Sequence, residues 1–299
     1  MSALLTYLED EREPALRLAS ACALPTLAVA RHRFPDEELK LLLDLPAGTQ
    51  TLVVYRSLDR PNEKLVELLL LARHARRAGV PRLVLVAPYL GYMRQDIAFQ
   101  PGEVVSQTIV GKFLAELFDA VITVDPHLHR ISRLDEAIPL QDAIALSAAG
   151  SLAERVASER DHPLLVGPDA ESRQWVESAA AVRQLDHAVC SKQRHGDRDV
   201  VITLPDVAVA GRAVVLLDDV ASSGRTLAGA ARLLLQAGAS SVDVAVTHAL
   251  FAGDALAVME SAGIGTVWST DCIQHPSNAV SMAPLLATAL NPLLQRWAG

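Results

Sequence analysis

Short apolar segments alternate with longer amphipathic segments along most of this chain. Runs rich in Val, Ile and Leu predict strands at Thr51–Tyr55, Leu83–Ala87, Ala120–Val124, Leu164–Val166, Ala213–Leu217, Val242–Thr247 and Gly265–Ser269. Because these runs are almost continuously apolar, we expect both faces of each strand to be buried, as in a parallel sheet.

Between these runs, apolar residues recur at helical spacing. The spacing predicts helices at Asn62–Ala78, Val105–Leu117, Ser172–Ala181 and Arg225–Ala237. Alternation of strand, helix and strand is typical of an α/β fold, in which mainly parallel sheets are flanked by helices.

Two long segments of the chain, 51–90 and 213–250, resemble each other. Each reads as strand, loop, helix, Ala-Gly and strand, and Gly79 and Gly238 stand where a left-handed helix cap is common. The match predicts two tandem domains, 1–146 and 147–281, joined near the small residues of Ala143–Ser151. Two questions stay open. The first is whether the helix around 282–299 packs back on the first domain. The second is whether the two segments arose by duplication or resemble each other only because all βαβ units share this pattern.

The composition is that of a globular protein, with 51% hydrophobic and 21% charged residues in 299. Lys and Arg number 27 against 35 Asp and Glu, so the formal net charge is −8. An acidic chain with 4% aromatic residues is a poor candidate for a nucleic-acid binder, and we expect no nucleic acid among its partners.

Neither end of the chain reads as a targeting or membrane segment. The first residues have no basic region before an apolar run, and the uncharged stretch Pro276–Gln295 is broken by Pro284 and Pro292. Cys22, Cys190 and Cys272 lie too far apart for a disulfide framework or a metal motif. We therefore expect a cytoplasmic protein with buried, reduced thiols and no membrane partner.

The segment Ala213–Leu227, AVVLLDDVASSGRTL, has the layout of a phosphate site. A buried strand leads into Asp218 and Asp219, then into small residues, and a helix is expected to begin near Thr226. Small residues let backbone N–H groups approach a phosphate, and the helix dipole favours the anion. The paired carboxylates suit sugar hydroxyls or a cation, although Asp and Ser are also ordinary helix caps.

This segment resembles the phosphoribosyl pyrophosphate loop of phosphoribosyltransferases and of ribose-phosphate pyrophosphokinases. Further blocks resemble the pyrophosphokinase family, in its order: RFPDEE at 33–38, Arg56–Leu71, Pro88–Asp96, Pro101–Ser106, Val121–His127, Val166–Ser172 and Thr247–Phe251. Because these blocks cover nearly the whole chain, the pyrophosphokinase family explains more of it than a lone phosphoribosyltransferase does. The resemblance implies two tandem phosphoribosyltransferase-like (Rossmann-like) domains.

The resemblance implies an enzyme that makes phosphoribosyl pyrophosphate and AMP from ribose 5-phosphate and ATP with Mg²⁺. It places ATP on the first domain. In this family a neighbouring subunit often helps to hold the adenine, so the resemblance also implies a homo-oligomer. The ATP residues it implies are Phe34, Asp36, Glu38, Arg94, Gln95 and Asp96. Without the resemblance, Phe34 would be interpreted as a residue that packs before a helix beginning at Pro35, and Arg94–Asp96 as a solvated loop.

The resemblance assigns ribose 5-phosphate to the second domain. The implied residues are Asp218, Asp219, Ser222, Ser223, Gly224, Arg225 and Thr226. Lys192 and Arg194 match the cationic positions of the family's catalytic loop, although Lys192–Arg198 alone is typical of a solvated hairpin tip. His127 and Asp169 match its magnesium-associated residues, with His127 acting through water or on phosphate. His129 receives no role.

Some positions depart from the family pattern. Gln193 stands where a basic residue is common, Arg225 replaces a small residue, and Glu171-Ser172 replaces a glycine pair. Gln193 and Arg225 keep open the alternative of a catalytically weak regulatory homologue. A phosphoribosyltransferase, and the same chemistry on another sugar phosphate, are two further alternatives.

Overall fold

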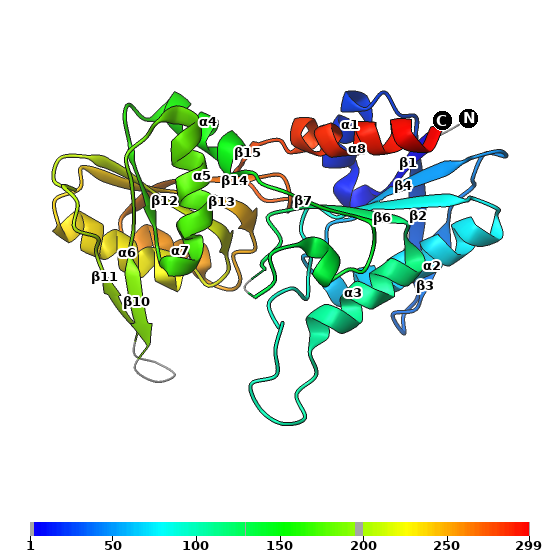
Figure 1. The fold of residues 1–299 in the computed structure, drawn as a ribbon, viewed down its shortest axis with the longest axis horizontal. Helices are drawn as coiled ribbons and strands as arrows, with labels where there is room; N and C mark the ends of the chain where they lie inside the picture. Colours follow the sequence, from blue (N-terminus) through cyan, green and yellow to red (C-terminus); the bar gives the residue numbers. More distant parts are fainter. Residues whose placement is uncertain (1–2, 129, 195–199, 299) are drawn as a thin grey trace. The chain divides into compact units, whose positions relative to one another are not determined.

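The computed structural model describes residues 3–128, 130–194 and 200–298, and only the backbone at 192–194, 200 and 201. The chain forms two compact units, each with its own sheet (Figure 1). Unit 1 comprises Met1–Leu146 and Met282–Gly299, and unit 2 comprises Ser147–Ser281. The C-terminal segment 282–299 therefore belongs with the N-terminal part of the chain.

Unit 1 is built on a seven-stranded sheet in which every neighbouring pair is parallel except β2–β3. Its order is β3 (Leu39–Leu42), β2 (Thr26–Arg33), β1 (Ala3–Leu8), β4 (Thr51–Tyr55), β5 (Arg82–Val86), β6 (Ala120–Val124) and β7 (Asp142–Leu146). Helices α1 (Arg12–Ala21) and α8 (Ala283–Ala298) cover one face, and α2 (Pro61–Arg77) and α3 (Ser106–Leu117) the other (Figure 1). The short helices η1 (Glu9–Glu11) and η2 (Leu134–Glu136) lie in the connections.

Unit 2 is built on a six-stranded sheet that is parallel throughout. Its order is β15 (Asn278–Val280), β14 (Ile264–Thr270), β13 (Ser241–Ala249), β12 (Ala213–Ala221), β8 (Leu164–Gly167) and β9 (His187–Val189). Helices α4 (Ala149–Glu159) and α5 (Arg173–Arg183) lie on one face, and α6 (Arg225–Gln236) and α7 (Ala255–Ser261) on the other, with η3 (Ala170–Ser172) between β8 and α5. A separate antiparallel hairpin consists of β10 (Ser191–Arg194) and β11 (Val200–Thr203).

The central strands are buried because their side chains alternate between two apolar layers. Val214 and Leu216 of β12 pack in the cluster that includes α6, whereas Val215 and Leu217 pack in the cluster that includes α4 and α5. A strand covered on both faces needs an unbroken apolar run, as the sequence predicts here. The predicted α/β class, with two mainly parallel sheets flanked by helices, is confirmed.

Both sheets follow the same strand order. Without β3, unit 1 reads second, first, third, fourth, fifth and sixth strand in chain order, and unit 2 reads the same without its β10–β11 hairpin. The additional strands follow the second strand of each unit in the chain: β3 follows β2 in unit 1, and the β10–β11 hairpin follows β9 in unit 2. The two glycines of the sequence repeat, Gly79 and Gly238, have φ of +85° and +92° just after α2 and α6.

The segment around Phe34 differs from the helix that its sequence alone would predict. A turn connects β2 to β3, in which Phe34 N donates to Glu38 O at 2.9 Å and Glu37 has φ of +73°. Pro35 therefore lies in a hairpin turn, and the segment carries Phe34 at the tip of two antiparallel strands.

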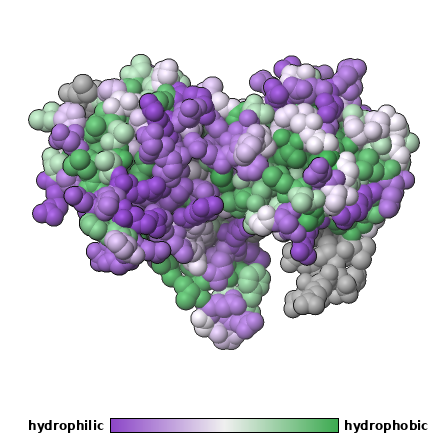
Figure 2. All heavy atoms as spheres, turned by 180° about the vertical axis from the view of Figure 1, so that it is seen from behind, coloured by the Kyte–Doolittle hydropathy of each residue, from purple (hydrophilic) through white to green (hydrophobic). Residues whose placement is uncertain are grey.

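In the described part of the chain, no helix is long and apolar enough to span a bilayer. On the face drawn in Figure 2, hydrophilic residues are spread over both units with apolar residues between them.

Candidate functional site

The loop after β12 presents an uncapped helix end. Gly224 precedes α6 with φ of +69°, and a Cβ there would lie 3.0 Å from Ala255 O and from Met259 Cγ. No side chain caps the start of α6 among the described residues, where the hydroxyls of Ser222 and Ser223 also have no hydrogen-bond partner. Free donors at a helix N-terminus are what a phosphate requires.

Two acidic residues stand side by side just before this loop. Asp219 is buried and its N–H donates to Asp218 Oδ1 at 3.0 Å, while Asp218 is half-buried. Burial raises the pKa of the Asp218 carboxyl well above its ordinary value, and the negative charges of Asp219 and Asp169 raise it further. The carboxylates lie close enough for their negative charges to repel one another, so the site favours a cation or hydroxyl donors.

Asp169 reaches the same region from the neighbouring strand. It lies two residues after the end of β8, and β8 pairs with β12 in parallel. One Asp169 oxygen accepts from Glu171 N at 3.1 Å. Burial, together with the charge of Asp169, raises the pKa of the Cys190 thiol to about 11. Unit 2 therefore brings Asp169, Asp218 and Asp219 to the carboxyl ends of adjacent strands, where open α/β sheets bind ligands.

Lys192 and Arg194 lie two positions apart on β10, with Lys192 opposite Ile202 and Arg194 opposite Val200 on β11. The structure describes only the backbone of both. The rest of the basic run, including His195 and Arg198, lies outside the described residues, as does His129. On either side of that gap, β10 and β11 pair antiparallel.

In unit 1, three of the expected ATP residues lie on the exposed β2–β3 turn. Phe34 is 41% exposed and meets His32 edge-on, with ring centroids 4.7 Å apart. Asp36 Oδ1 accepts from Glu38 N at 3.3 Å, and both acidic side chains are exposed. An aromatic face beside two carboxylates is available there to a ligand from outside the chain.

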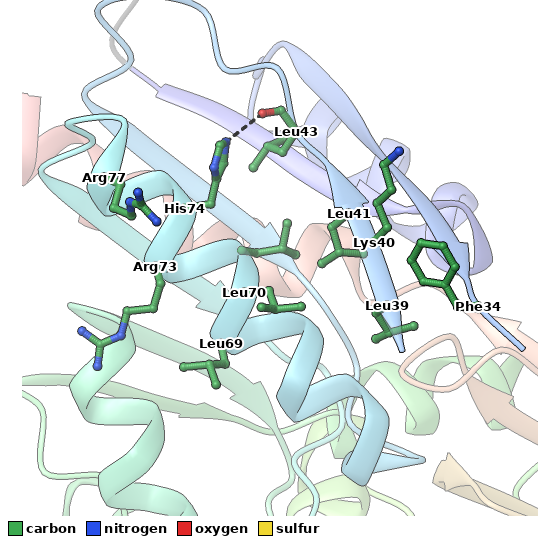
Figure 3. Close-up of a pocket in the computed structure, with 11 residues that line it drawn as sticks. Phe34, Leu39, Lys40, Leu41, Leu43, Leu69, Leu70, Arg73, His74 and Arg77 are labelled. Carbon is green, nitrogen blue, oxygen red and sulfur yellow. Dashed lines mark hydrogen bonds between the residues drawn. The ribbon is translucent and has the colours of Figure 1, made fainter. Parts of the chain in front are cut away.

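A cavity of about 480 Å³ lies beside Phe34, between β3 and α2 (Figure 3). Leucines of both elements line it, His74 Nε2 contacts Leu43 O at 3.1 Å, and Arg73 extends away from β3. Phe34 is the only expected site residue in its lining. This hollow therefore does not coincide with the expected site for phosphate chemistry.

The expected ATP segment Arg94–Asp96 lies in the loop between β5 and α3. Gln95 Oε1 accepts from Ser106 N at 3.2 Å and Ser106 Oγ at 2.7 Å, so Gln95 holds the start of α3. Arg94 is exposed. The Asp96 side chain is 2% exposed, and among the described residues its Oδ2 has no hydrogen-bond partner. A buried carboxylate oxygen of this kind needs a further hydrogen-bond donor or a cation, which water, an ion or a ligand can supply.

Arg130, which the sequence analysis did not single out, pairs with one of the expected site residues. Its Nη1 donates to Asp96 Oδ1 at 2.6 Å, and its guanidinium lies 5.9 Å from the Phe99 ring centroid. Arg130 is 34 positions from Asp96 and belongs to no motif, so no sequence signal could have linked the two. It joins the loop after β5 to the loop after β6, which also carries His127.

His127 and Asp169 belong to different units, and each is described within its own. His127 is half-buried three residues after β6. Within residues 3–128, 130–194 and 200–298, no cluster of three or more His, Cys, Asp or Glu side chains could alone hold a metal ion.

Two family models match the chain. Residues 4–118 match the N-terminal domain of ribose phosphate pyrophosphokinase, and residues 138–274 match a phosphoribosyl transferase domain. The first match covers most of unit 1, and the second covers most of unit 2.

Similar proteins align over nearly the full length. The ribose-phosphate pyrophosphokinase of Methanopyrus kandleri is 33% identical over 279 residues, 93% of this chain and 94% of that protein. Its counterpart in Methanosarcina acetivorans is 32% identical over 280 residues, 93% and 96% of the two chains. A crystal structure of phosphoribosylpyrophosphate synthetase from Mycobacterium smegmatis shares the fold, with a TM-score of 0.82, 21% identity and coverage of 99% and 100%. The resemblance noted in the sequence is thereby confirmed, and the chain belongs to the ribose-phosphate pyrophosphokinase family.

Proposed function

We propose that this protein transfers the pyrophosphoryl group of Mg-ATP to the C1 hydroxyl of ribose 5-phosphate, giving phosphoribosyl pyrophosphate and AMP. The proposal rests on the arrangement of the residues at the end of β12 and in the loop that follows, in a chain that belongs to this family. Two adjacent carboxylates lead directly into an uncapped helix end with free Ser222 and Ser223 hydroxyls in the described structure.

The sugar phosphate binds along this loop. Asp218 and Asp219 accept hydrogen bonds from the ribose hydroxyls, which suit paired carboxylates at a strand end. The 5-phosphate takes backbone N–H groups and hydroxyls of residues 222–226, at the positive end of the α6 dipole. Arg225 is exposed at the first position of α6 and adds a cation near that phosphate.

The carboxylates of unit 2 also fit Mg²⁺. Burial raises the pKa of the Asp218 carboxyl, and the charges of Asp219 and Asp169 add to this rise, so a divalent cation beside these carboxylates would favour their ionised form. Mg²⁺ prefers oxygen ligands and completes its shell with water and substrate phosphates. Asp169 is the proposed ligand in unit 2, and His127 in unit 1 acts through water or on phosphate. Bound Mg²⁺ supplies charge neutralisation at phosphate oxygens.

ATP binds through unit 1. Arg94 meets the adenine face or a phosphate with its planar guanidinium, and Gln95 and Asp96 offer polar contacts beside it. Phe34, Asp36 and Glu38 are exposed on a hairpin turn, where a second copy of the chain can present its ATP to them. The proposal therefore includes a homodimer or a higher homo-oligomer.

In the chemical step, the anomeric hydroxyl oxygen attacks the β-phosphorus of ATP in line. The bond from that phosphorus to the oxygen bridging the α- and β-phosphates breaks, AMP leaves with that oxygen, and the hydroxyl proton is released. Such transfers depend on positioning and on stabilising charge at the phosphoryl oxygens. Lys192 and Arg194 supply that positive charge.

A coupled assay of AMP formation tests this function. With ATP and Mg²⁺, AMP must appear only when ribose 5-phosphate is added, and chelation by EDTA must abolish it. Release of pyrophosphate from phosphoribosyl pyrophosphate on addition of a nucleobase would instead indicate a phosphoribosyltransferase. A folded protein without either activity would favour a regulatory homologue, with Gln193 and Arg225 as the departures to revert first.

A further inference from the structure

The antiparallel pair of β2 and β3 extends beyond the rest of the unit 1 sheet. Residues 26–29 of β2 pair with β1, whereas residues 30–33 pair with β3. Along β2, which the structure describes in full, no residue pairs with both neighbours. Residues 30–42 therefore form a two-stranded arm with Phe34 at its tip.

The arm needs support from outside the sheet, because an isolated two-stranded hairpin is marginally stable at best in water. On the β3 side, Leu41 is partly buried against the core of unit 1. The cavity of about 480 Å³ nevertheless lies between β3 and α2 (Figure 3). Apolar packing leaves this space unfilled, so other contacts must fix the arm against α2.

Ion pairs join the arm to α2 on the β2 side. Arg31 and Arg33 are two positions apart on a strand, so their side chains lie on the same face. Arg31 Nη1 donates to Glu67 Oε1 at 2.5 Å, and Arg33 Nη2 donates to Glu63 Oε1. Glu63 and Glu67 are four positions apart and so lie on one face of the helix. Two turns of α2 thus hold two arginines of the arm.

The α2 side of this contact is fixed in the interior of unit 1. Glu67 is 0% exposed and Arg56, directly after β4, is 1% exposed. Arg56 Nε donates to Glu67 Oε2 at 2.8 Å, and Arg56 Nη1 donates to Asp10 Oδ2 at 2.7 Å. Asp10 Oδ1 in turn lies 3.6 Å from Arg31 Nη2. The arm is therefore tied to buried groups at the end of a central strand.

The turn at the tip follows these anchors directly. Phe34 N donates to Glu38 O at 2.9 Å, and Glu37 N donates to Phe34 O at 2.9 Å. Both bonds close the turn at the residue after Arg33. A displacement of Arg33 would therefore displace Phe34, Asp36 and Glu38 together.

We infer that Glu63 and Glu67 are positioning residues for ATP. They hold the arm through Arg33 and Arg31, and so set the place at which the tip meets the ATP of a second copy of the chain. The inference rests on the proposed function, in which residues of the tip contact that ATP, and it adds which side chains fix the tip.

Substituting the anchors without changing the tip tests the inference. Arg31→Met with Glu63→Gln removes the cation that pairs with Glu67 and the carboxylate that pairs with Arg33, and it retains the buried pair of Arg56 and Glu67. KM for ATP should rise about three- to tenfold in this double variant. Because the anchors contribute only binding, kcat and KM for ribose 5-phosphate should stay at wild-type values.

Glu13→Gln with Arg17→Met is the matched control. It makes the same two substitutions in an exposed ion pair of α1, in which the charged atoms lie 3.5 Å apart, and it should change neither KM. If R31M/E63Q does not fold, E63Q alone replaces it, with an expected rise of about twofold in KM for ATP. A wild-type KM for ATP, or equal rises in both KM values, would overturn the inference.

Mixed oligomers test whether the arm acts on a second copy. A K192A chain has an intact arm but loses turnover under the proposed mechanism, whereas an R31M/E63Q chain retains its own site. Assembled with an excess of K192A, R31M/E63Q should regain a KM for ATP close to that of wild type, because K192A arms then serve its sites. An unchanged KM in oligomers that carry both affinity tags would overturn the inference.

Phe34→Ala distinguishes a failure of the inference from a failure of the proposed function. A raised KM for ATP in F34A together with a wild-type KM in R31M/E63Q overturns the inference alone. A wild-type KM in F34A contradicts the proposed role of the tip, and the inference with it. If sugar-dependent AMP formation is absent altogether, the proposed function fails, and the Kd for ATP from calorimetry replaces KM in the same comparisons.

Discussion

Asp219 donates its backbone N–H to the carboxylate of Asp218 at 3.0 Å, which fixes two acidic side chains next to each other at the end of β12. The bond stabilises one charge on Asp218, but burial and the charges of Asp219 and Asp169 outweigh it and raise the Asp218 pKa well above 3.8. A fold that keeps like charges together in the absence of ligand sacrifices stability for binding.

Asp218→Asn should therefore abolish activity and stabilise the metal-free protein. Because the folded-state pKa of Asp218 is raised, the folded protein keeps this proton at pH values where the unfolded chain has lost it. The free energy of unfolding consequently falls as pH rises above the ordinary pKa, until pH passes the folded pKa. The asparagine side chain does not titrate, so the free energy of unfolding of this variant does not fall with pH for this reason.

Melting in EDTA at pH 5 and pH 8 provides the measurement. The Tm of D218N should exceed that of wild type by about 2–5 °C, with the larger gain at pH 8. Asp206→Asn is a control, because Asp206 is an exposed acidic residue of unit 2 outside the proposed site. A lower Tm in D218N than in wild type at both pH values would contradict the prediction.

Gly224→Ala should weaken sugar-phosphate binding. Its φ of +69° is unfavourable for alanine, and the new Cβ would lie 3.0 Å from Ala255 O, so the loop must shift. We expect a loss of about 1–2 kcal/mol in the free energy of unfolding and a severalfold rise in KM for ribose 5-phosphate.

Gly211→Ala is the matched control for this change. Gly211 has φ of +76°, but its added Cβ would meet nothing within 4 Å. It should incur a similar backbone cost of about 1 kcal/mol and leave both KM values unchanged. If the two variants gave the same KM for ribose 5-phosphate, the crowding of Gly224 would not control the loop.

The sequence predicts the buried strands of this fold better than its edges. β4 coincides with the apolar run predicted at Thr51–Tyr55, because both of its faces are covered. β12 begins at Ala213 as predicted, but it continues four residues beyond the predicted end at Leu217, through Asp218 and Asp219 to Ala221. β2 was not predicted, because its Arg31 and Arg33 pair with Glu67 and Glu63 of α2 and interrupt the apolar pattern. Tertiary ion pairs of this kind leave no local periodicity to detect.

The candidate site likewise has one part that the sequence predicts and another part that it does not. The loop after β12 was predictable because its residues are consecutive, and one strand–helix turn positions them all. The contact of Arg130 with Asp96 joins two loops at the ends of adjacent strands, and only the sheet order brings them together.

Arg130→Met should raise KM for ATP about tenfold and leave KM for ribose 5-phosphate unchanged. The variant removes the donor to Asp96 and frees a carboxylate that is 2% exposed, at an expected cost of about 1–3 kcal/mol. Steady-state kinetics with each substrate varied in turn measure the split. Arg133→Met is the control, since Arg133 pairs with Asp135 on the surface and should affect neither KM. Equal effects on both substrates would show a general loss of structure instead.

Lys192→Ala should reduce turnover and leave substrate affinity nearly unchanged. A cation that approaches the transferred group gains most of its interaction when charge develops on the phosphoryl oxygens, so its loss falls on kcat. A reduction of about 100-fold or more is expected for one such donor. Ser191→Ala tests whether any change on β10 has this effect, because Ser191 adjoins Lys192 without a charge. Rapid-quench measurement of AMP in a single turnover isolates the chemical step, and a wild-type rate in K192A would remove Lys192 from the proposed mechanism.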